Sequence, residues 1–161
     1  MIEVLVTVVL FSLLFGACLT VLLSGSDSWQ SNDVKLQLQQ ELRKGMDWMK
    51  NDLLQGGVST ITDVPADGNW YTTITFKTSN GVSGGNISWP SDTTQYLLSG
   101  NQLQRKVGST TQSIAQSIRS LQVRRQASNS SLVEVLMSAQ KNSLRGTIIT
   151  DSLDFQVQFR N

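Results

Sequence analysis

The sequence predicts an α+β protein in which one long N-terminal helix packs on an antiparallel β-sheet head. Three observations lead to this fold class. Residues 1–23 are almost entirely apolar, residues 24–57 carry apolar side chains along one helical stripe, and residues 58–161 alternate between short apolar and polar stretches. A helix with one apolar stripe and a sheet with one apolar face bury those surfaces against each other.

The first 23 residues predict a membrane-spanning helix. Their only ionisable side chains are Glu3 and Cys18. As a helix the segment would be about 34 Å long at roughly 1.5 Å per residue, which is enough to cross the hydrocarbon of a bilayer. A cleaved secretory signal has a basic start and an apolar stretch of about 7–15 residues. This run is longer and has no basic residue, and no Lys/Arg cluster on either flank orients it across the membrane.

Glu3 is the unexpected residue of this segment. A carboxylate inside a bilayer costs on the order of a few kcal/mol, so one that persists there normally has a partner. Two interpretations stay open on physical grounds. Either Glu3 lies at the membrane surface and has no role, or it is buried in lipid and pairs with a cation of another subunit.

Residues 24–57 predict the second half of the same helix. Gly56 and Gly57 end the run, as glycines commonly do after a helix. A single helix from the membrane to about residue 55 would be on the order of 80 Å long. Five apolar residues follow one another at spacings of four, four, three and four and would pack against the head: Leu38, Leu42, Met46, Met49 and Leu53.

Residues 58–161 predict several short strands. Residues 70–77 alternate and would place Trp70, Ile74 and Phe76 on one face, with Asn80-Gly81 as the turn that follows. Residues 95–98 and 102–107 predict a hairpin around Ser99-Gly100-Asn101. Further strands are expected at 118–123, 132–137 and 154–159. The last two strands would each gather three apolar residues on one face: Val133, Val135 and Met137, and Phe155, Val157 and Phe159.

The composition argues against an enzyme. The chain has no histidine, which excludes Ser-His-Asp triads and most zinc sites, and its single cysteine cannot form an intramolecular disulfide. A formal net charge of +1 gives no reason to expect nucleic acid. Asp63, Asp67 and Asn69 around Gly68 are more typical of a turn than of a calcium loop. We therefore expect no catalytic residue, cofactor or metal, and we interpret Arg105-Lys106 and Arg124-Arg125 as solvated strand positions.

Residues 2–6, IEVLV, followed by a long apolar helix, resemble the N-terminal methylation segment of type IV pilins and type II secretion pseudopilins. In that family a short basic leader ends in glycine before a phenylalanine, and a small polar residue, an aliphatic pair and a glutamate follow. Met1-Ile2-Glu3 matches the aliphatic pair and the glutamate. The leader, its glycine and the methylated first residue are not in the sequence. We therefore expect that the chain starts about two residues inside the mature protein, as it would from a start codon assigned too late.

Further segments of the chain resemble J-type minor pseudopilins and minor pilins. The first is Tyr-Leu-Leu-x-Gly-x-x-Leu-x-Arg at residues 96–105, followed by Ile-x-x-Leu-x-Val from Ile118 and a terminal alternating strand. The others are the helix segments Glu41-Leu42-Arg43 and Asp52-Leu53. The first motif is specific for the superfamily, and the rest matches more loosely.

The resemblance implies a structural role and a set of partners. Glu3 would pair with the N-terminal amine of a neighbouring subunit as it enters a filament. The chain would be a minor pseudopilin that helps to prime or cap a type II secretion pseudopilus for protein export. Its partners would be other pseudopilins or minor pilins, lipid of the bacterial inner membrane and prepilin peptidase, with the head in the periplasm. Two alternatives remain: a minor pilin of a type IV pilus or competence system, and a single-pass anchored binding domain with no filament.

Overall fold

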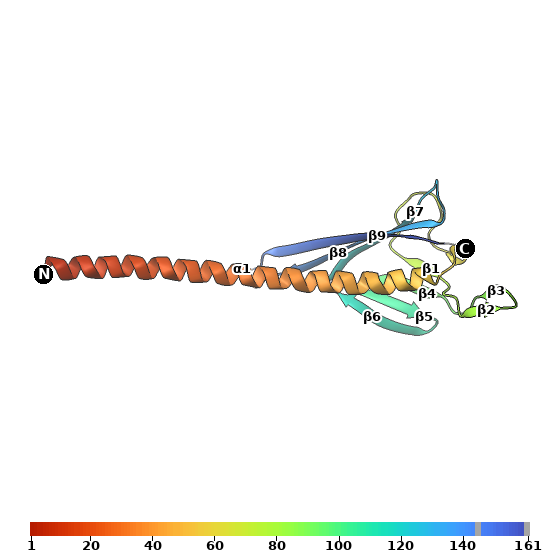
Figure 1. Ribbon diagram of the computed structural model, residues 1–161, viewed down its shortest axis with the longest axis horizontal. Coiled ribbons are helices and arrows are strands. Elements are labelled where there is room, and N and C mark those ends of the chain that lie inside the picture. The colour runs from red at the N-terminus through yellow and green to blue at the C-terminus, as the bar shows by residue number, and fades with distance from the viewer. Residues whose placement is uncertain (144–145, 160–161) are drawn as a thin grey trace.

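The computed structural model describes residues 1–143 and 146–159, and only the backbone at position 27. One α-helix, α1 (Ile2–Leu54), runs without interruption through the first third of the chain, and its N-terminal half projects away from the rest (Figure 1). A short 3-10 turn at Val58–Thr60 follows. The strands after it are β1 (Ile74–Phe76), β2 (Gly81–Ser83), β3 (Asn86–Ser88), β4 (Thr94–Ser99), β5 (Gln102–Val107), β6 (Thr110–Gln116), β7 (Ile118–Arg125), β8 (Leu132–Asn142) and β9 (Ile148–Gln158).

The strands form three antiparallel sheets. The first has the order β1-β4-β5-β6, the second is the separate hairpin β2-β3, and the third has the order β7-β8-β9. The first and third sheets flank the second half of α1, with β6 and β9 on opposite sides of it (Figure 1). The coarse α+β prediction of one long helix and antiparallel sheets is therefore confirmed.

The core lies between the second half of α1 and the inner faces of the two larger sheets. The five stripe residues of the helix are at most 6% exposed and belong to one cluster with the sheet residues: Leu38, Leu42, Met46, Met49 and Leu53. Gly45 lies among them, and a Cβ built there would be 3.0 Å from Leu103 Cδ2 and 3.4 Å from Met137 Cε. The absence of a side chain at Gly45 thus lets the sheets approach the helix closely.

The structure corrects two expectations for residues 70–81. Ile74 and Phe76 are fully buried, but Trp70 is 41% exposed and lies outside β1. Asn80-Gly81 is not the turn of a hairpin, because Gly81 already begins β2 and the turn falls at Gly84-Gly85 with both φ angles positive. Glycine adopts such angles without strain, and the adjacent Gly84-Gly85 pair therefore sets the turn four residues after the predicted position.

The strand predictions find β1, β4, β5, β7, β8 and β9 and miss β2, β3 and β6. The hairpin at 95–107 corresponds to β4 and β5, and 118–123, 132–137 and 154–159 fall on β7, β8 and β9, although Phe159 follows the last paired residue. Strand β6 was missed because its first four residues are polar and exposed. The helix ends at Leu54 with Gln55 as its C-cap, within one residue of the expected end at about residue 55.

Candidate assembly site

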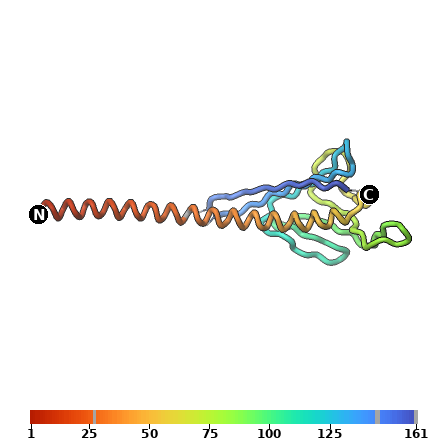
Figure 2. Tube along the Cα trace, viewed as in Figure 1, coloured from red at the N-terminus to blue at the C-terminus, as the bar shows by residue number. Residues whose placement is uncertain are grey.

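The first half of α1 exposes an apolar surface that the head leaves uncovered. Every large apolar side chain from Met1 to Leu23 that the structure records as exposed has at least 44% of its surface accessible. An 18-residue window of this helix has a mean hydropathy of 2.6, and none of it is buried. By length and composition this helix could cross a membrane. The trace in Figure 2 shows it extending alone beyond the sheets.

Glu3 lies exposed near the far end of this apolar half. The hydroxyls of Thr7, Ser12 and Thr20 each donate to the carbonyl oxygen four residues earlier, at 2.6–2.7 Å, so the helix satisfies them internally. The Glu3 carboxylate makes no hydrogen bond or ion pair with any residue that the structure describes. Placed in lipid, it would be the charged group of this segment that still needs a partner.

The second half of α1 is fastened to the head by a polar contact as well as by its apolar stripe. Tyr96 Oη donates to Asp52 Oδ2 at 2.7 Å, and Arg105 Nε donates to the same oxygen at 2.6 Å. Tyr96 and Arg105 face each other across β4 and β5. The two ends of the motif at residues 96–105 thus meet on one helix carboxylate, which is only 8% exposed. We call these three residues the junction triad.

The pKa values of two residues of the junction triad, Tyr96 and Arg105, are raised. Burial, assisted by the hydrogen bond to Asp52, raises the pKa of Tyr96 far above its usual range. The hydrogen bond to Asp52 likewise raises the pKa of Arg105, whose guanidinium also lies 5.6 Å from the ring centroid of Trp48. The tyrosine therefore stays protonated and the arginine stays charged over the whole physiological range. The junction triad thus joins α1 to both strands of the β4–β5 hairpin through one carboxylate.

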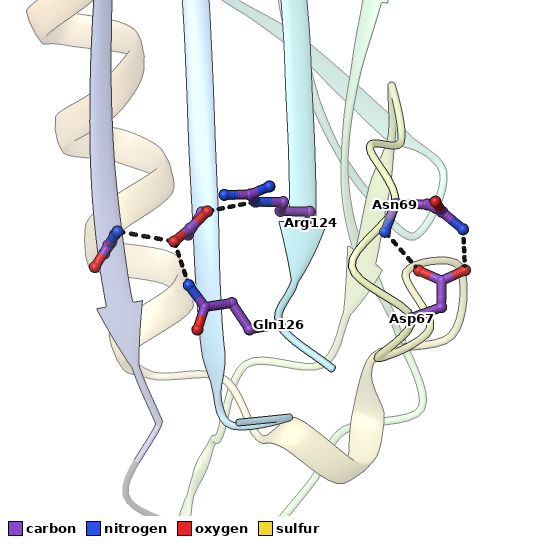
Figure 3. Close-up of polar contacts among 6 residues, drawn as sticks. Asp67, Asn69, Arg124 and Gln126 are labelled. Carbon is purple, nitrogen blue, oxygen red and sulfur yellow. Dashed lines mark hydrogen bonds and ion pairs between the residues drawn. The ribbon is translucent and has the colours of Figure 1, made fainter. Parts of the chain in front are cut away.

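A second polar cluster lies on the face of the third sheet that points away from α1. Glu134, 7% exposed, accepts hydrogen bonds from Arg124, from Gln126 Nε2 at 2.6 Å and from Gln156 Nε2 at 2.8 Å (Figure 3). The guanidinium of Arg124 lies 4.4 Å from the ring centroid of Trp70. Trp70 thus holds its loop against the sheet, which explains why it leaves the face predicted for it.

Two of the arginines interpreted as solvated are therefore paired within the chain. Arg105 meets an acid 53 positions earlier, which no local pattern indicates. Arg124 meets Glu134, its direct cross-strand partner in β7 and β8. The sequence does place Arg124 and Glu134 on the polar faces of two strands, because polar and apolar residues alternate in both. Only the strand register, however, identifies them as partners.

The acidic residues around Gly68 form a loop and do not converge on a metal site. Asp67 accepts hydrogen bonds from Asn69 N at 2.9 Å and from Asn69 Nδ2 at 2.8 Å (Figure 3). It also accepts one from Tyr71 Oη at 2.6 Å. Asp63 instead accepts from the amide and hydroxyl of Thr75. Within the described residues, no group of three or more His, Cys, Asp or Glu side chains is arranged to hold a metal ion.

The chain was compared with known proteins in three ways. It matches no protein-family model, and no curated protein or solved structure is significantly similar to it.

Proposed function

We propose that this chain is a structural subunit of a pilin-like filament, specifically a minor pseudopilin of a type II secretion system. Residues 1–23 hold it in the bacterial inner membrane before assembly, and the head lies in the periplasm. Helix halves of neighbouring subunits then pack together to form the filament. The head helps to prime or cap the assembly that serves protein export, and we expect it to have no catalytic role, cofactor or nucleic-acid partner.

The observation that supports this proposal most is the contrast between the two halves of α1. The second half seats the head through its apolar stripe and the junction triad. The first half is apolar all round and carries one carboxylate for which the described residues offer no partner. An unpaired carboxylate and an unpaired cation in hydrocarbon relieve each other's desolvation when two subunits dock side by side. Glu3 would thereby set the register between subunits.

Two other functions fit parts of the same structure. A minor pilin of a type IV pilus or competence system would use Glu3 in the same way and differ only in its partners. A single-pass anchored binding domain would use residues 1–23 as an anchor alone, and Glu3 would then be dispensable. The exposed carboxylate inside the apolar half favours the filament subunit over the anchored domain, because an anchor gains nothing from a buried charge.

The experiment compares Glu3→Gln with Asp47→Asn in the full-length gene. Both changes remove one exposed carboxylate from α1, but Asp47 lies outside the apolar half. Breaking a buried ion pair costs about 3–5 kcal/mol, which is more than a hundredfold in an association constant. We expect Glu3→Gln to move the protein from large complexes to monomers when membranes are extracted in mild detergent and sedimented. Asp47→Asn should sediment like the unaltered chain, and equal complexes from all three proteins would refute the filament role.

A further inference from the structure

The third sheet ends at an edge that is formed by strand β9. Among the described residues β9 is the last strand in the order β7-β8-β9 and pairs only with β8. Its 11 residues, at about 3.4 Å each, give an edge of roughly 37 Å. The strand lies against α1 and runs along it in the same direction (Figure 1). We call the side of β9 that faces away from β8 the open edge.

The hydrogen bonds at the two ends of β9 show which backbone groups face the open edge. Just before the strand, Ser143 N donates to Thr147 O at 2.8 Å, and just after it Phe159 N donates to Ser131 O at 3.0 Å. The register between these two contacts is continuous, and in an antiparallel ladder alternate residues bond to the neighbouring strand. Odd-numbered residues of β9 therefore bond to β8, and even-numbered residues turn their N–H and C=O groups to the open edge.

The backbone groups along the open edge are available for another strand. Four amides of the row have no recorded partner among the residues that the structure describes: those of Thr150, Asp154, Gln156 and Gln158. The amide of Ser152 donates instead to the side chain of Asp151, at 2.8 Å, as expected where no strand lies opposite. Proline, lysine and register shifts commonly protect a sheet edge, and β9 has none of them. The open edge is thus a template for strand addition.

A small groove lies between the open edge and α1. It has a volume of about 100 Å³ and is lined by residues of both elements: Gln39, Leu42, Arg43, Asp151, Ser152 and Leu153. Leu153 lies on the same face of the sheet as the buried Val157, because both are odd-numbered, yet 37% of Leu153 is exposed. A strand added at the open edge would cover Leu153 and place every second side chain over this groove.

The side chains beside the open edge indicate the chemistry of the strand that fits it. Strand addition binds a partner through its main chain and selects it through alternate side chains. On the face that α1 covers, the partner residue next to Leu153 would be apolar. On the opposite face, Asp154 is exposed and forms no ion pair with a described residue, so a cation would stand beside it. The open edge therefore fits an extended segment in which apolar and basic residues alternate.

The direction of β9 argues against antiparallel pairing with the β9 strand of a second copy. Two identical strands paired in this way are related by a twofold axis that reverses the strand direction. Because β9 runs along α1, the same axis would reverse the helix and point the two apolar halves in opposite directions (Figure 1). Two such copies could not share one side of a membrane or lie parallel in one filament.

From these observations we infer that the open edge of β9 is completed by a strand of a different subunit of the assembly. The inference rests on the proposed function, because a subunit that primes or caps a filament has neighbours unlike itself. It extends that function by assigning a contact between heads. The neighbouring subunit adds a strand to the 3-stranded sheet, binds the free backbone groups of β9 and covers Leu153.

The first test removes one amide of the open edge from the full chain in membranes. Asp154→Pro deletes an N–H that faces the edge and not β8, and its ring prevents another strand from pairing there. Asp154→Ala is the matched control, because it removes the same carboxylate and keeps the amide. A photo-reactive phenylalanine analogue in place of the exposed Thr150 captures the neighbour at the edge. We expect the adduct to be at least about tenfold weaker with Asp154→Pro than with Asp154→Ala.

The adduct from position 150 is identified by mass spectrometry. The inference expects a different membrane-anchored protein, cross-linked within an extended segment of its head. Equal adducts from Asp154→Pro and Asp154→Ala would overturn the inference, because the contact would then not use the backbone of the edge. An adduct to a second copy of this chain would overturn it as well.

A separate reporter distinguishes failure of this inference from failure of the proposed function. The same photo-reactive analogue in place of Phe11, which is 72% exposed, captures whatever packs against the apolar half. Capture at position 11 without capture at position 150 would reject the strand addition and keep the filament subunit. Loss of both adducts would reject both proposals.

The second test uses hydrogen exchange at single-residue resolution and leaves β9 unaltered, so it does not depend on the folding of a variant. It compares complexes extracted in mild detergent with the same chain diluted until it sediments as a monomer. We expect the amides of Asp154 and Gln156 to exchange at least about tenfold more slowly in the complexes, because an added strand bonds to them. The amide of Phe155 faces β8 and should exchange slowly in both samples. Equally fast exchange of Asp154 and Gln156 in both samples would overturn the inference.

Discussion

The junction triad is the residue-scale feature on which the helix–head arrangement depends most. One buried carboxylate, Asp52, joins the helix to both strands of the β4–β5 hairpin. Its two donors are 44 and 53 positions away along the chain. A contact between such distant segments forms only when the head closes on α1, and it therefore reports the native docking of the two parts.

Removing Asp52 should destabilise the head strongly. Asp52→Ala leaves the Tyr96 hydroxyl and the Arg105 guanidinium without their acceptor, and an unpaired buried group of this kind costs about 1–3 kcal/mol. We expect a fall of about 2–3 kcal/mol in the free energy of unfolding, measured by urea denaturation of the full chain in detergent with tryptophan fluorescence. Asp47→Ala, at an exposed position of the same helix, serves as the control and should change stability by less than about 0.5 kcal/mol.

The raised pKa of Tyr96 makes stability depend on alkaline pH. The unfolded tyrosine ionises near its ordinary value of 10.0, whereas the folded one keeps its proton to higher pH. The folded state thus binds more protons above pH 10, and its stability must fall there as pH rises, by up to about 1.4 kcal/mol per pH unit. Tyr96→Phe should flatten that decline between about pH 10 and 11.5. An unchanged decline would contradict the burial of this phenol, and Tyr71→Phe controls for the other tyrosine.

At the scale of elements, the apolar stripe of α1 determines how the sheets wrap the helix. The stripe could be read from spacing alone, because residues four and three apart share one face of a helix. Leu42 and Leu36 on this helix make a matched pair, since the first is 1% and the second 57% exposed.

Truncating the buried member of that pair should cost far more than truncating the exposed one. Leu42→Ala removes a fully buried side chain and leaves a cavity, for which about 2–5 kcal/mol is typical. Leu36→Ala should stay within about 0.5 kcal/mol of the unaltered chain. Chemical denaturation of the head measures the change in the free energy of unfolding for each variant. Similar decreases for the two substitutions would contradict the packing of this face.

Gly45 sets the distance between α1 and the two sheets. Gly45→Leu would force a side chain against Leu103 and Met137, and overpacking of this kind costs about 1–3 kcal/mol. Gly25→Leu is the control, because nothing lies within 4 Å of a Cβ at that helix position. We expect the midpoint of head unfolding to fall for Gly45→Leu and to stay unchanged for Gly25→Leu, as measured by thermal denaturation.

The elements that could be predicted are those whose burial leaves a periodic signal. The helix, its stripe, the hairpin of β4 and β5, and strands β7 and β8 all alternate at the period of their structure. Strand β6 could not be found, because Thr110–Ser113 are polar on both faces at the edge of the sheet. Trp70 alternates correctly but turns away to stack on Arg124, a partner that only the folded chain supplies.

Only part of the candidate site could likewise be predicted from the sequence. Glu3 was evident from sequence, because a single charge interrupts an apolar run. The junction triad was not, since it depends on strand register and on contacts between distant segments. The motif at residues 96–105 pointed to the right strands, but its meeting with Asp52 appears only in three dimensions.

At the scale of the whole molecule, the chain consists of a head seated on half a helix and an apolar half-helix that the described residues of the head leave uncovered (Figure 2). An exposed apolar surface of this length is stable only in lipid or against other apolar helices. In the proposed function, the apolar half of α1 lies first in lipid and then against the helices of neighbouring subunits. The proposed function also gives Glu3 the cation that it lacks within the described chain.

The measurement that tests this account most directly is photo-cross-linking from Phe11 in intact membranes. With the photo-reactive analogue at that position, the account predicts a covalent adduct to a neighbouring subunit, either a second copy or a related small membrane protein. It also predicts that Glu3→Gln abolishes the adduct while Asp47→Asn leaves it unchanged. A chain that yields no protein adduct, or the same adduct with and without the Glu3 carboxylate, would contradict the central claim.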